Sequence, residues 1–523
     1  MTKPIRRVAI IGTGPAGAIA TDALLKEQAF DEVRVFDRQD TIGGTWVYKH
    51  GREAGIPSLR ELVEEQADNP VVVPSHLPCK TPASPEVDSH VLRYSDTGVH
   101  EALHSNLPPV IMSFTQEPLP EILSEQTISR YGTDAPFRSR EVVRDYVHDI
   151  FKRGGHEKLV QLSTTVERAE KEGDEWVLTL RRWEPETRTN HWMVERFDGL
   201  VVATGKYYIL YMPKVPGLLE YDQKFPGRIK HSKHYRNVDM FRGKKVIVVG
   251  GSVSAFDALH DIRVVSKGPV YASLREPLKT FGWAPFHHPD IIVKPRLKHF
   301  DAETGRITFL DDTTVDDVDI IFFATGYDFS FPFLPKEKVR NRRIQGVYQH
   351  VFDIADPSLA FIGMISRGYT FRVFEWQAVA AARVLAGRAK MPNREEMLAW
   401  ERDIIAERGD GVEFPSIADD MAGYFNCLRE IAGEPAPGTK GRVLPPFDPE
   451  WADSFKHLVR KRQEWWDKEA RIAEGKLTAN GINGAAKKGV NGAVNGVNGP
   501  ANGVNRQVRG VNGPVNGVNG VHF

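Results

Sequence analysis

The stretch Val8-Ala9-Ile10-Ile11-Gly12-Thr13-Gly14-Pro15-Ala16-Gly17 decides the fold of the first part of the chain. A short aliphatic run leads into glycines spaced Gly-x-Gly-x-x-Gly, and residues 16–26 continue with a helical pattern. Gly12 permits a tight turn, Gly14 lets the backbone approach a pyrophosphate, and Gly17 lets the helix pack closely on the strand. The stretch therefore predicts a dinucleotide site at the positive end of a helix.

Two further features complete this first site. Asp37 follows the strand predicted over residues 33–36, at the distance from the glycines where a carboxylate binds the ribose. Gly43-Gly44-Thr45-Trp46 comes next, and its small residues let the chain run close to a large planar ring. The residues predicted to contact this first dinucleotide are Gly12, Gly14, Ala16, Gly17, Asp37, Gly44, Thr45 and Trp46.

A weaker fingerprint, Gly250-Gly251-Ser252-Val253-Ser254-Ala255, follows a predicted strand at 245–249. Serine replaces the second glycine and alanine the third, but both are small enough to keep the turn feasible. A helix over 254–265 and a strand over 270–274 complete a second βαβ unit. We predict that Gly250, Ser252 and Ser254 contact a second dinucleotide.

Ser273-Leu274-Arg275 stands where the first site has its acid. A carboxylate there would repel a 2′-phosphate, whereas an arginine can bind it. Ser273 and Arg275 therefore favour NADPH over NADH as the second dinucleotide. The alternative, that Arg275 is only a solvated surface charge, stays open.

Two buried runs that end in Ala-Thr-Gly, residues 200–205 and 320–326, are typical of strands that lead back from one domain to another. They add Thr204, Gly205, Thr325 and Gly326 to the predicted cofactor contacts. We expect an α/β fold of two Rossmann-like domains, with the second inserted in the first and C-terminal helices after it. The predicted ranges are 1–210 and 331–475 for the first domain, with a surface insertion at 50–93; 211–330 for the second; and 476–523 for a disordered Asn-Gly-rich tail.

The composition excludes several classes of function. Lys plus Arg equals Asp plus Glu and the isoelectric point is about 7.3, so neither a nucleic acid nor an anionic membrane is expected as a partner. Cys79 and Cys427 are the only cysteines, which excludes a disulfide framework and favours the cytoplasm. No run approaches the roughly 18 apolar residues of a membrane span. The pair His287-His288 lacks a third ligand, so no metal is expected.

The string FxGxxxHxxxY lies between the two fingerprints and is met by Phe225, Gly227, His231 and Tyr235. With both fingerprints it resembles the flavin-containing monooxygenases of the two-dinucleotide class, most of all soluble fungal members that tailor secondary metabolites. Further resemblances lie at Ser105-Asn106, Phe137–Arg140, Pro357–Gly363 and Glu375-Trp376-Gln377.

The resemblance implies FAD in the first site and NADPH in the second. It also implies formation of a flavin hydroperoxide, which transfers one oxygen atom to the nitrogen of an alkaloid-like small molecule. The product would be an N-hydroxyl, N-oxide or nitrone. Asn106 would lie beside the reacting edge of the flavin as the catalytic residue, and Ser105, Val166 and Gln377 would add cofactor contacts. We expect His231 to order the domain linker or support NADPH rather than move protons.

Three alternatives remain at this point: oxygenation of sulfur, Baeyer–Villiger oxidation of a ketone, and an uncoupled NADPH oxidase. The Baeyer–Villiger subclass usually has tryptophan four residues after the motif histidine, where this chain has Tyr235 followed by Arg236. A flavoprotein disulfide reductase would need a redox-active cysteine pair, which this chain lacks.

Overall fold

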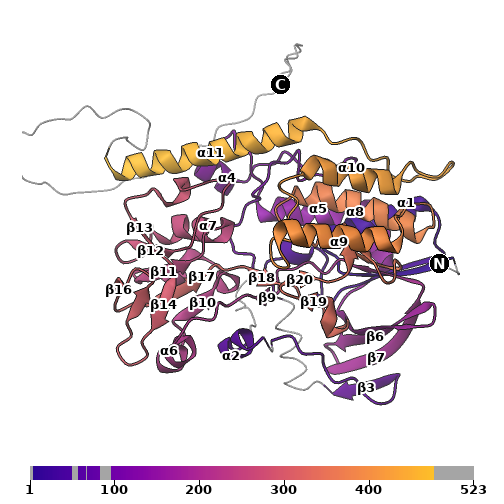
Figure 1. Cartoon of the computed structure of the whole chain (residues 1–523), viewed down its shortest axis with the longest axis horizontal. Helices are drawn as coiled ribbons and strands as arrows, with labels where there is room; N and C mark the ends of the chain where they lie inside the picture. Colours follow the sequence, from indigo (N-terminus) through magenta and orange to yellow (C-terminus); the bar gives the residue numbers. More distant parts are fainter. Residues whose placement is uncertain (1–3, 50–56, 66, 83–95, 476–523) are drawn as a thin grey trace, which may run out of the picture.

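The computed structural model describes residues 4–49, 57–65, 67–82 and 96–475 (Figure 1). The predicted tail at 476–523 and much of the insertion at 50–93 lie outside the described residues. The expected α/β architecture is confirmed. Two separate, largely parallel sheets form the centres of two α/β bodies, and the second body is inserted in the first.

The first body is built on a seven-stranded sheet in the order β21-β22-β23-β8-β1-β2-β4. β1 pairs in parallel with β2 and with β8, in the register Val8↔Val33 and Val8↔Gly199. The bounds of its strands are β1 Arg7–Ile11, β2 Glu32–Phe36, β4 Val160–Gln161, β8 Gly199–Val202, β21 Val347–Tyr348, β22 Phe352–Asp353 and β23 Leu359–Phe361.

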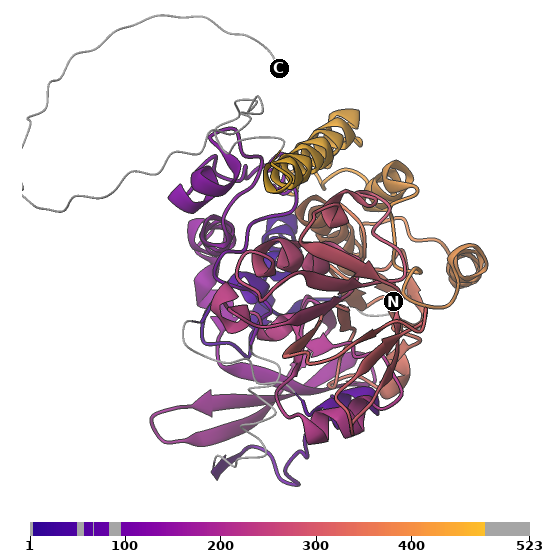
Figure 2. The same cartoon turned by 90° about the vertical axis from the view of Figure 1, so that its left-hand side faces the viewer.

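Each face of this sheet is covered. Val8 and Ile10 of β1 lie in a hydrophobic cluster with helices α1 (Pro15–Glu27), α5 (Arg140–Arg153) and α8 (Thr370–Leu385). Ala9 and Ile11 alternate to the other face. They pack there with an antiparallel sheet in the order β3-β7-β6-β5, whose strands are Cys79–Pro82, Thr189–Phe197, Glu175–Glu184 and Thr164–Glu172. Figure 2 shows this antiparallel sheet at the opposite end of the molecule from helix α11 (Pro449–Ala473).

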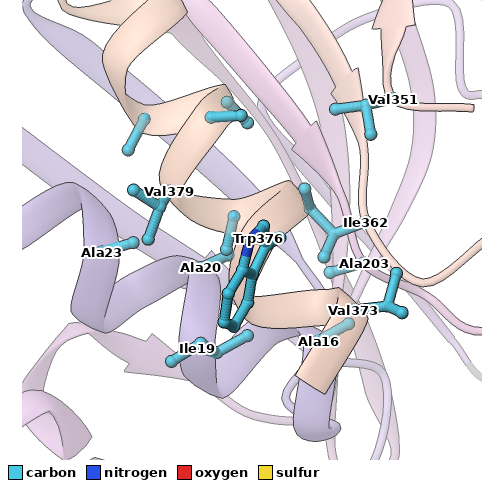
Figure 3. Packing of buried hydrophobic residues seen from close by; sticks show 14 of the residues in the cluster. Ala16, Ile19, Ala20, Ala23, Ala203, Val351, Ile362, Val373, Trp376 and Val379 are labelled. Carbon is cyan, nitrogen blue, oxygen red and sulfur yellow. The ribbon is translucent and has the colours of Figure 1, made fainter. Parts of the chain in front are cut away.

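Helices α1 and α8 pack closely because α1 presents small residues to its partner. Ala16, Ala20 and Ala23 of α1 lie against the fully buried Trp376 and Val379 of α8 (Figure 3). Their small side chains let the two helix axes approach and leave room for the indole ring. This contact fixes the start of α1, and with it the glycine-rich turn that precedes the helix.

The second body contains a five-stranded parallel sheet in the order β10-β17-β11-β12-β13. Helix α7 (Val253–Ile262) covers one face, and a small antiparallel sheet, β14-β15-β16, lies beside the other together with α6 (Leu218–Lys224). The strand bounds are β10 Ile229–His231, β11 Val246–Val249, β12 Val270–Ser273, β13 Ile291–Lys294, β14 Leu297–Phe300, β15 Ile307–Phe309, β16 Thr314–Val315 and β17 Ile320–Phe323.

The two connections between the bodies pair with each other. β9 (Ile209–Leu210) leads out of the first body and β18 (Tyr327–Asp328) leads back, and the two form an antiparallel pair. This pair lies at the predicted boundaries near residues 210 and 330. The two connections are therefore held side by side by main-chain hydrogen bonds.

Helix α11 departs from the expected division, which placed residues 331–475 in the first domain. Its first turn packs there, with Trp451 against Trp376, but Trp466 lies in the core of the second body against Phe256 (Figure 1). Arg462 of α11 also forms an ion pair with Asp257 of α7. The helix therefore spans both bodies. The other C-terminal helices are α9 Arg394–Arg408 and α10 Met421–Ala432.

The described parts of residues 50–93 are mostly exposed or half-buried, but they are anchored to the rest of the chain at two places. Helix α2 (Leu59–Val63) buries Leu62, and Ala67 follows it, in a hydrophobic cluster with Ile321 of the second sheet. β3 extends the antiparallel sheet by pairing with β7. Weak periodicity hid these contacts because each segment buries only one or two side chains.

Candidate active site

One large cavity of about 1610 Å³ reaches from the first glycine-rich turn to the second. Its wall contains Gly12–Ala16 at one end and Gly250–Ser254 at the other, with Asn106 also on it. Of the residues predicted as cofactor contacts, the following line it: Gly12, Gly14, Ala16, Asp37, Gly44, Thr45, Trp46, Asn106, Val166, Thr204, Gly205, Gly250, Ser252, Ser254, Ser273, Arg275, Thr325 and Gly326. The two turns therefore face one shared space.

The first turn has the shape that a pyrophosphate needs. Gly12 has φ +111°, and a Cβ there would lie 2.5 Å from the carbonyl oxygen of Ala203. A Cβ on Gly17 would lie 1.9 Å from the oxygen of Gly12. Gly14 has an ordinary φ of −71°, and a Cβ there would meet only Gly44, at 3.6 Å. Gly12 and Gly17 are thus required by the fold, whereas Gly14 keeps the space before helix α1 open, which fits a dinucleotide phosphate.

Asp37 has a second task besides the predicted ribose contact. Its Oδ2 accepts hydrogen bonds from the backbone N–H of Thr13 at 2.7 Å and from the Thr13 hydroxyl at 2.5 Å. Its Oδ1 accepts from the N–H of Gln39 at 2.8 Å. A carboxylate has about four lone-pair positions, so acceptor capacity remains for a ribose hydroxyl. Asp37 therefore holds the turn in place and still borders the cavity.

The second turn repeats the first. Gly250 has φ +143°, and a Cβ there would lie 2.6 Å from the carbonyl oxygen of Ala324, as one on Gly12 would from Ala203. Both alanines begin an Ala-Thr-Gly sequence, so each of these motifs supplies the carbonyl against which a first glycine packs. Alanine stands at the third glycine position, and its Cβ lies 3.3 Å from where a Cβ on Gly250 would be, so Ala255 is a second reason why position 250 requires glycine.

Basic side chains gather beside the second turn, after β12 and at the start of β14. Arg275 is exposed and lines the cavity, as predicted for a 2′-phosphate contact. Arg296 and Lys298, around the start of β14, line the same cavity, and Lys298 also pairs with Asp312. The sequence analysis missed both residues, although the alternating basic residues Lys294, Arg296 and Lys298 were a visible signal. Ser273 donates its hydroxyl to the carbonyl of Pro295 at 2.9 Å and so holds this segment against β12.

Replacing Arg275 with alanine is expected to raise the KM for NADPH by roughly 10- to 100-fold, because one charge-assisted hydrogen bond is lost. The KM for NADH should change little, since NADH has no 2′-phosphate. Steady-state oxidation of both coenzymes measures the difference, with Lys279→Ala, an exposed neighbour, as the matched control. Equal changes for NADPH and NADH would contradict the assignment.

Two residues of the FxGxxxHxxxY motif, His231 and Tyr235, form hydrogen bonds within the second body, and that of His231 reaches Gly326 beside the returning strand β18. His231 is 1% exposed; its Nδ1 accepts from the N–H of Lys233, and its Nε2 donates to the carbonyl of Gly326 at 3.1 Å. Burial lowers the pKa of His231 to about 3, so the ring is neutral and both nitrogens are engaged. Tyr235 lines the cavity and donates its hydroxyl to Asp261 at 2.8 Å. These contacts favour the linker-ordering interpretation over proton transfer.

Three other predicted cofactor contacts lie off the cavity wall. Gly17 packs under the first turn, as described above. Ser105 is buried; its hydroxyl donates to the carbonyl of Leu107 and accepts from the N–H of Arg138. Gln377 is also buried; it accepts from the N–H of Gly363 and donates to the hydroxyl of Tyr424. Ser105 and Gln377 do not line the cavity themselves. They support the neighbours that do, Asn106 and Gly363.

Comparison with known proteins agrees with this geometry. The model of the flavin-binding monooxygenase-like family matches residues 131–274 and 288–434, more than half of the chain. The chain belongs to this family. A flavin-containing monooxygenase of Aspergillus flavus, ustF2, is 26% identical over 501 residues, covering 87% of this chain and 97% of that protein. The trimethylamine monooxygenase of a Roseovarius species is 29% identical over 461 residues, covering 83% and 90%.

Among solved structures, the S-allyl-L-cysteine S-oxygenase of Allium sativum superimposes with a TM-score of 0.68 at 25% identity, covering 88% of this chain and 95% of that one. The family match identifies the present chain as a flavin-binding monooxygenase-like protein. Within the part of the chain that the structure describes, no helix combines the length and apolarity that a membrane crossing requires.

Proposed function

We propose that this monooxygenase adds one oxygen atom to the nitrogen of a small, alkaloid-like molecule, and that it binds FAD at the first turn and NADPH at the second. NADPH and O₂ are consumed, one oxygen atom joins the nitrogen, and the other leaves as water. When bound, NADPH supplies the hydride and FAD supplies the activated oxygen. The observation that carries the proposal is the shared cavity, because both turns and Asn106 border it.

The residues around Asn106 hold it at this wall. Asn106 is exposed to the cavity, while its neighbours Ser105 and Leu107 are buried. The Ser105 hydroxyl joins residues 105–107 to the start of α5 through Arg138. Arg138 stands where the family resemblance has proline, and its guanidinium donates to the carbonyls of Pro120 and Phe137. This support holds the backbone at Asn106, whose carboxamide borders the cavity and can donate a hydrogen bond toward a reacting centre there.

Nitrogen is favoured over a ketone by the use this chain makes of its motif. Tyr235 binds Asp261 within the second body, and Arg236 donates to the carbonyls of Thr97 and Val99, so both side chains already have structural partners. The Roseovarius relative is named for an amine substrate. Sulfur is the second candidate, because the Allium sativum structure is that of an S-oxygenase.

The proposal is tested with three matched substrates that differ in the atom to be oxygenated. NADPH oxidation, hydrogen peroxide release and product mass are measured with benzylmethylamine, benzyl methyl sulfide and benzyl methyl ketone. Nitrogen oxygenation predicts one hydroxylamine per NADPH, or one nitrone per two NADPH, for the amine, with the sulfide and ketone turned over less efficiently. A higher kcat/KM for the sulfide would establish the second candidate. Peroxide equal to NADPH with all three would indicate an oxidase.

Replacing Asn106 with alanine is expected to leave NADPH-dependent flavin reduction intact while lowering the product formed per NADPH by roughly 10-fold or more, the value of one hydrogen bond to a charged group. The missing oxygen should appear as hydrogen peroxide, measured in the same reaction. Asn341→Ala is the control, because this asparagine is exposed, donates to Asp410 away from the cavity wall, and should leave coupling unchanged when it is replaced. Tight coupling in Asn106→Ala would contradict the role assigned here.

A further inference from the structure

Lys206 is a cation at the flavin end of the cavity for which the structure provides no carboxylate. It follows Thr204 and Gly205 directly after β8, and its side chain is half-buried because it borders the cavity. Its Nζ donates to the carbonyl oxygen of Ile365 at 2.6 Å. The rings of Tyr207 and Phe329 lie 5.9 and 5.6 Å from the same nitrogen. No described acidic side chain forms an ion pair with it.

Three other cations on the cavity wall have acidic partners. Arg342 pairs with Asp328, Arg367 with Glu413 at 2.6 Å, and Lys456 with Asp453 at 3.0 Å. These pairs leave little net charge to offer a ligand. Lys206 is different, because a single backbone carbonyl balances it and an ammonium group has three donors. Two donors therefore remain for a group that enters the cavity.

A charge in this position is costly unless a ligand compensates it. Burial lowers the pKa of Lys206 to about 8, and loss of hydration is the sole cause of that shift. An apolar side chain would fill the same space without this penalty. An unpaired, desolvated cation in a cleft is a typical feature of a functional site.

We propose that Lys206 binds a carboxylate of the substrate, so that the molecule oxygenated at nitrogen is also an anion of the amino-acid type. This inference rests on the proposed nitrogen oxygenation for the reacting atom, but not for the anion itself. A carboxylate matches the two free donors of one ammonium. The rings of Tyr207 and Phe329 lie beside the contact and leave it less hydrated than that of a fully exposed lysine.

Ile365 places the Lys206 contact close to the first glycine-rich turn. It lies two residues after Gly363, and a Cβ on Gly363 would lie 3.3 Å from the Cβ of Ala16 at the start of α1. The carbonyl that holds Lys206 is therefore in the segment that borders the first glycine turn. A carboxylate bound at Lys206 would anchor one end of the substrate near the flavin and leave the nitrogen to be placed by the remaining wall.

Binding is tested without turnover on the FAD-loaded protein. Phenylacetate and its neutral counterpart phenylacetamide are titrated while the visible spectrum of the flavin is followed, in the wild type, Lys206→Met, Lys206→Arg and Lys214→Met. Lys214 also lines the cavity, but it is exposed and pairs with Glu65, so its variant is the matched control. We expect Lys206→Met to weaken phenylacetate binding by about 10-fold or more, the loss of one charge-assisted hydrogen bond. Phenylacetamide binding should be unchanged, and Lys206→Arg should retain most of the phenylacetate affinity.

Turnover separates this inference from the proposed function. N-benzylglycine has a carboxylate where N-benzylglycinamide has a neutral amide. The kcat/KM of N-benzylglycine divided by that of N-benzylglycinamide should fall by about 10-fold in Lys206→Met. If neither amine is oxygenated but phenylacetate still depends on Lys206, the nitrogen proposal fails and the anion site stands. Equal phenylacetate binding in wild type and Lys206→Met overturns the anion site. So does loss of FAD from Lys206→Met, which would mean that the ammonium binds the flavin.

Discussion

Gly14→Val is expected to yield a folded protein that has lost its flavin. Gly14 has an ordinary backbone conformation, and a Cβ there would make only a van der Waals contact with Gly44, at 3.6 Å. The protein itself therefore tolerates the larger side chain. The added methyl groups would instead occupy the cavity directly before helix α1, where the pyrophosphate must approach the backbone. We expect FAD binding to weaken at least about 100-fold, or about 2.7 kcal/mol.

The measurement is the ratio of absorbance at 450 nm to that at 280 nm after purification, with circular dichroism to establish folding. Gly17→Val is the contrasting variant, because its Cβ would lie 1.9 Å from the carbonyl oxygen of Gly12 and the turn itself would have to move. Gly17→Val should fail to fold, whereas Gly14→Val should fold and remain colourless. A yellow, fully loaded Gly14→Val protein would show that the flavin lies elsewhere.

Local spacing made the two turns predictable. The strand, the glycines and the helix are contiguous in sequence, and the steric demands on Gly12 and Gly250 come from backbone geometry that any such turn shares. The fold class followed from these turns and from the two Ala-Thr-Gly strands between and after them. What the sequence did not reveal is that the two alanine carbonyls, of Ala203 and Ala324, are the surfaces against which those glycines pack.

The predictions that differ from the structure concern residues whose partners are distant in sequence. Gln377 binds Gly363 and Tyr424 rather than facing the cavity, and the contact with Tyr424 depends on how α10 packs on α8. The position of Lys206 could not be predicted, because its ammonium is held by the carbonyl of Ile365, which is distant in sequence. Helix α11 shows a strong helical pattern, yet nothing in that pattern says that Trp451 and Trp466 enter two different cores. Periodicity predicts a buried face but not the surface that buries it.

Arg442→Met is expected to destabilise the first body by about 3–5 kcal/mol, because it removes the cation that binds three carboxylates and leaves them, among the described residues, only Lys26 as an ion-pair partner, 3.0 Å from Asp22 and 3.9 Å from Glu117. Arg442 is 1% exposed and binds all three: Asp22 of α1 at 2.6 Å, Glu375 of α8 at 2.7 Å, and Glu117 at 2.7 and 2.8 Å. The nearby carboxylates raise the pKa of Arg442 above its ordinary value, so it remains charged. Methionine fills similar space but compensates none of this negative charge.

This ion cluster joins α1 and α8, whose packing holds the first glycine-rich turn in place. Its loss should therefore also weaken the binding of the flavin. Urea unfolding followed by tryptophan fluorescence, with flavin release followed in parallel, measures both effects. Arg442→Lys keeps one positive charge but cannot reach three carboxylates with a single ammonium, so it should fall between the wild type and Arg442→Met. Arg460→Met, at an exposed site on α11 with a 3.9 Å pair to Glu464, should change stability by less than about 1 kcal/mol. If Arg442→Met matched Arg460→Met, the cluster would contribute to the specificity of packing and not to its stability, and the flavin turn would rest on the α1 and α8 apolar contact alone.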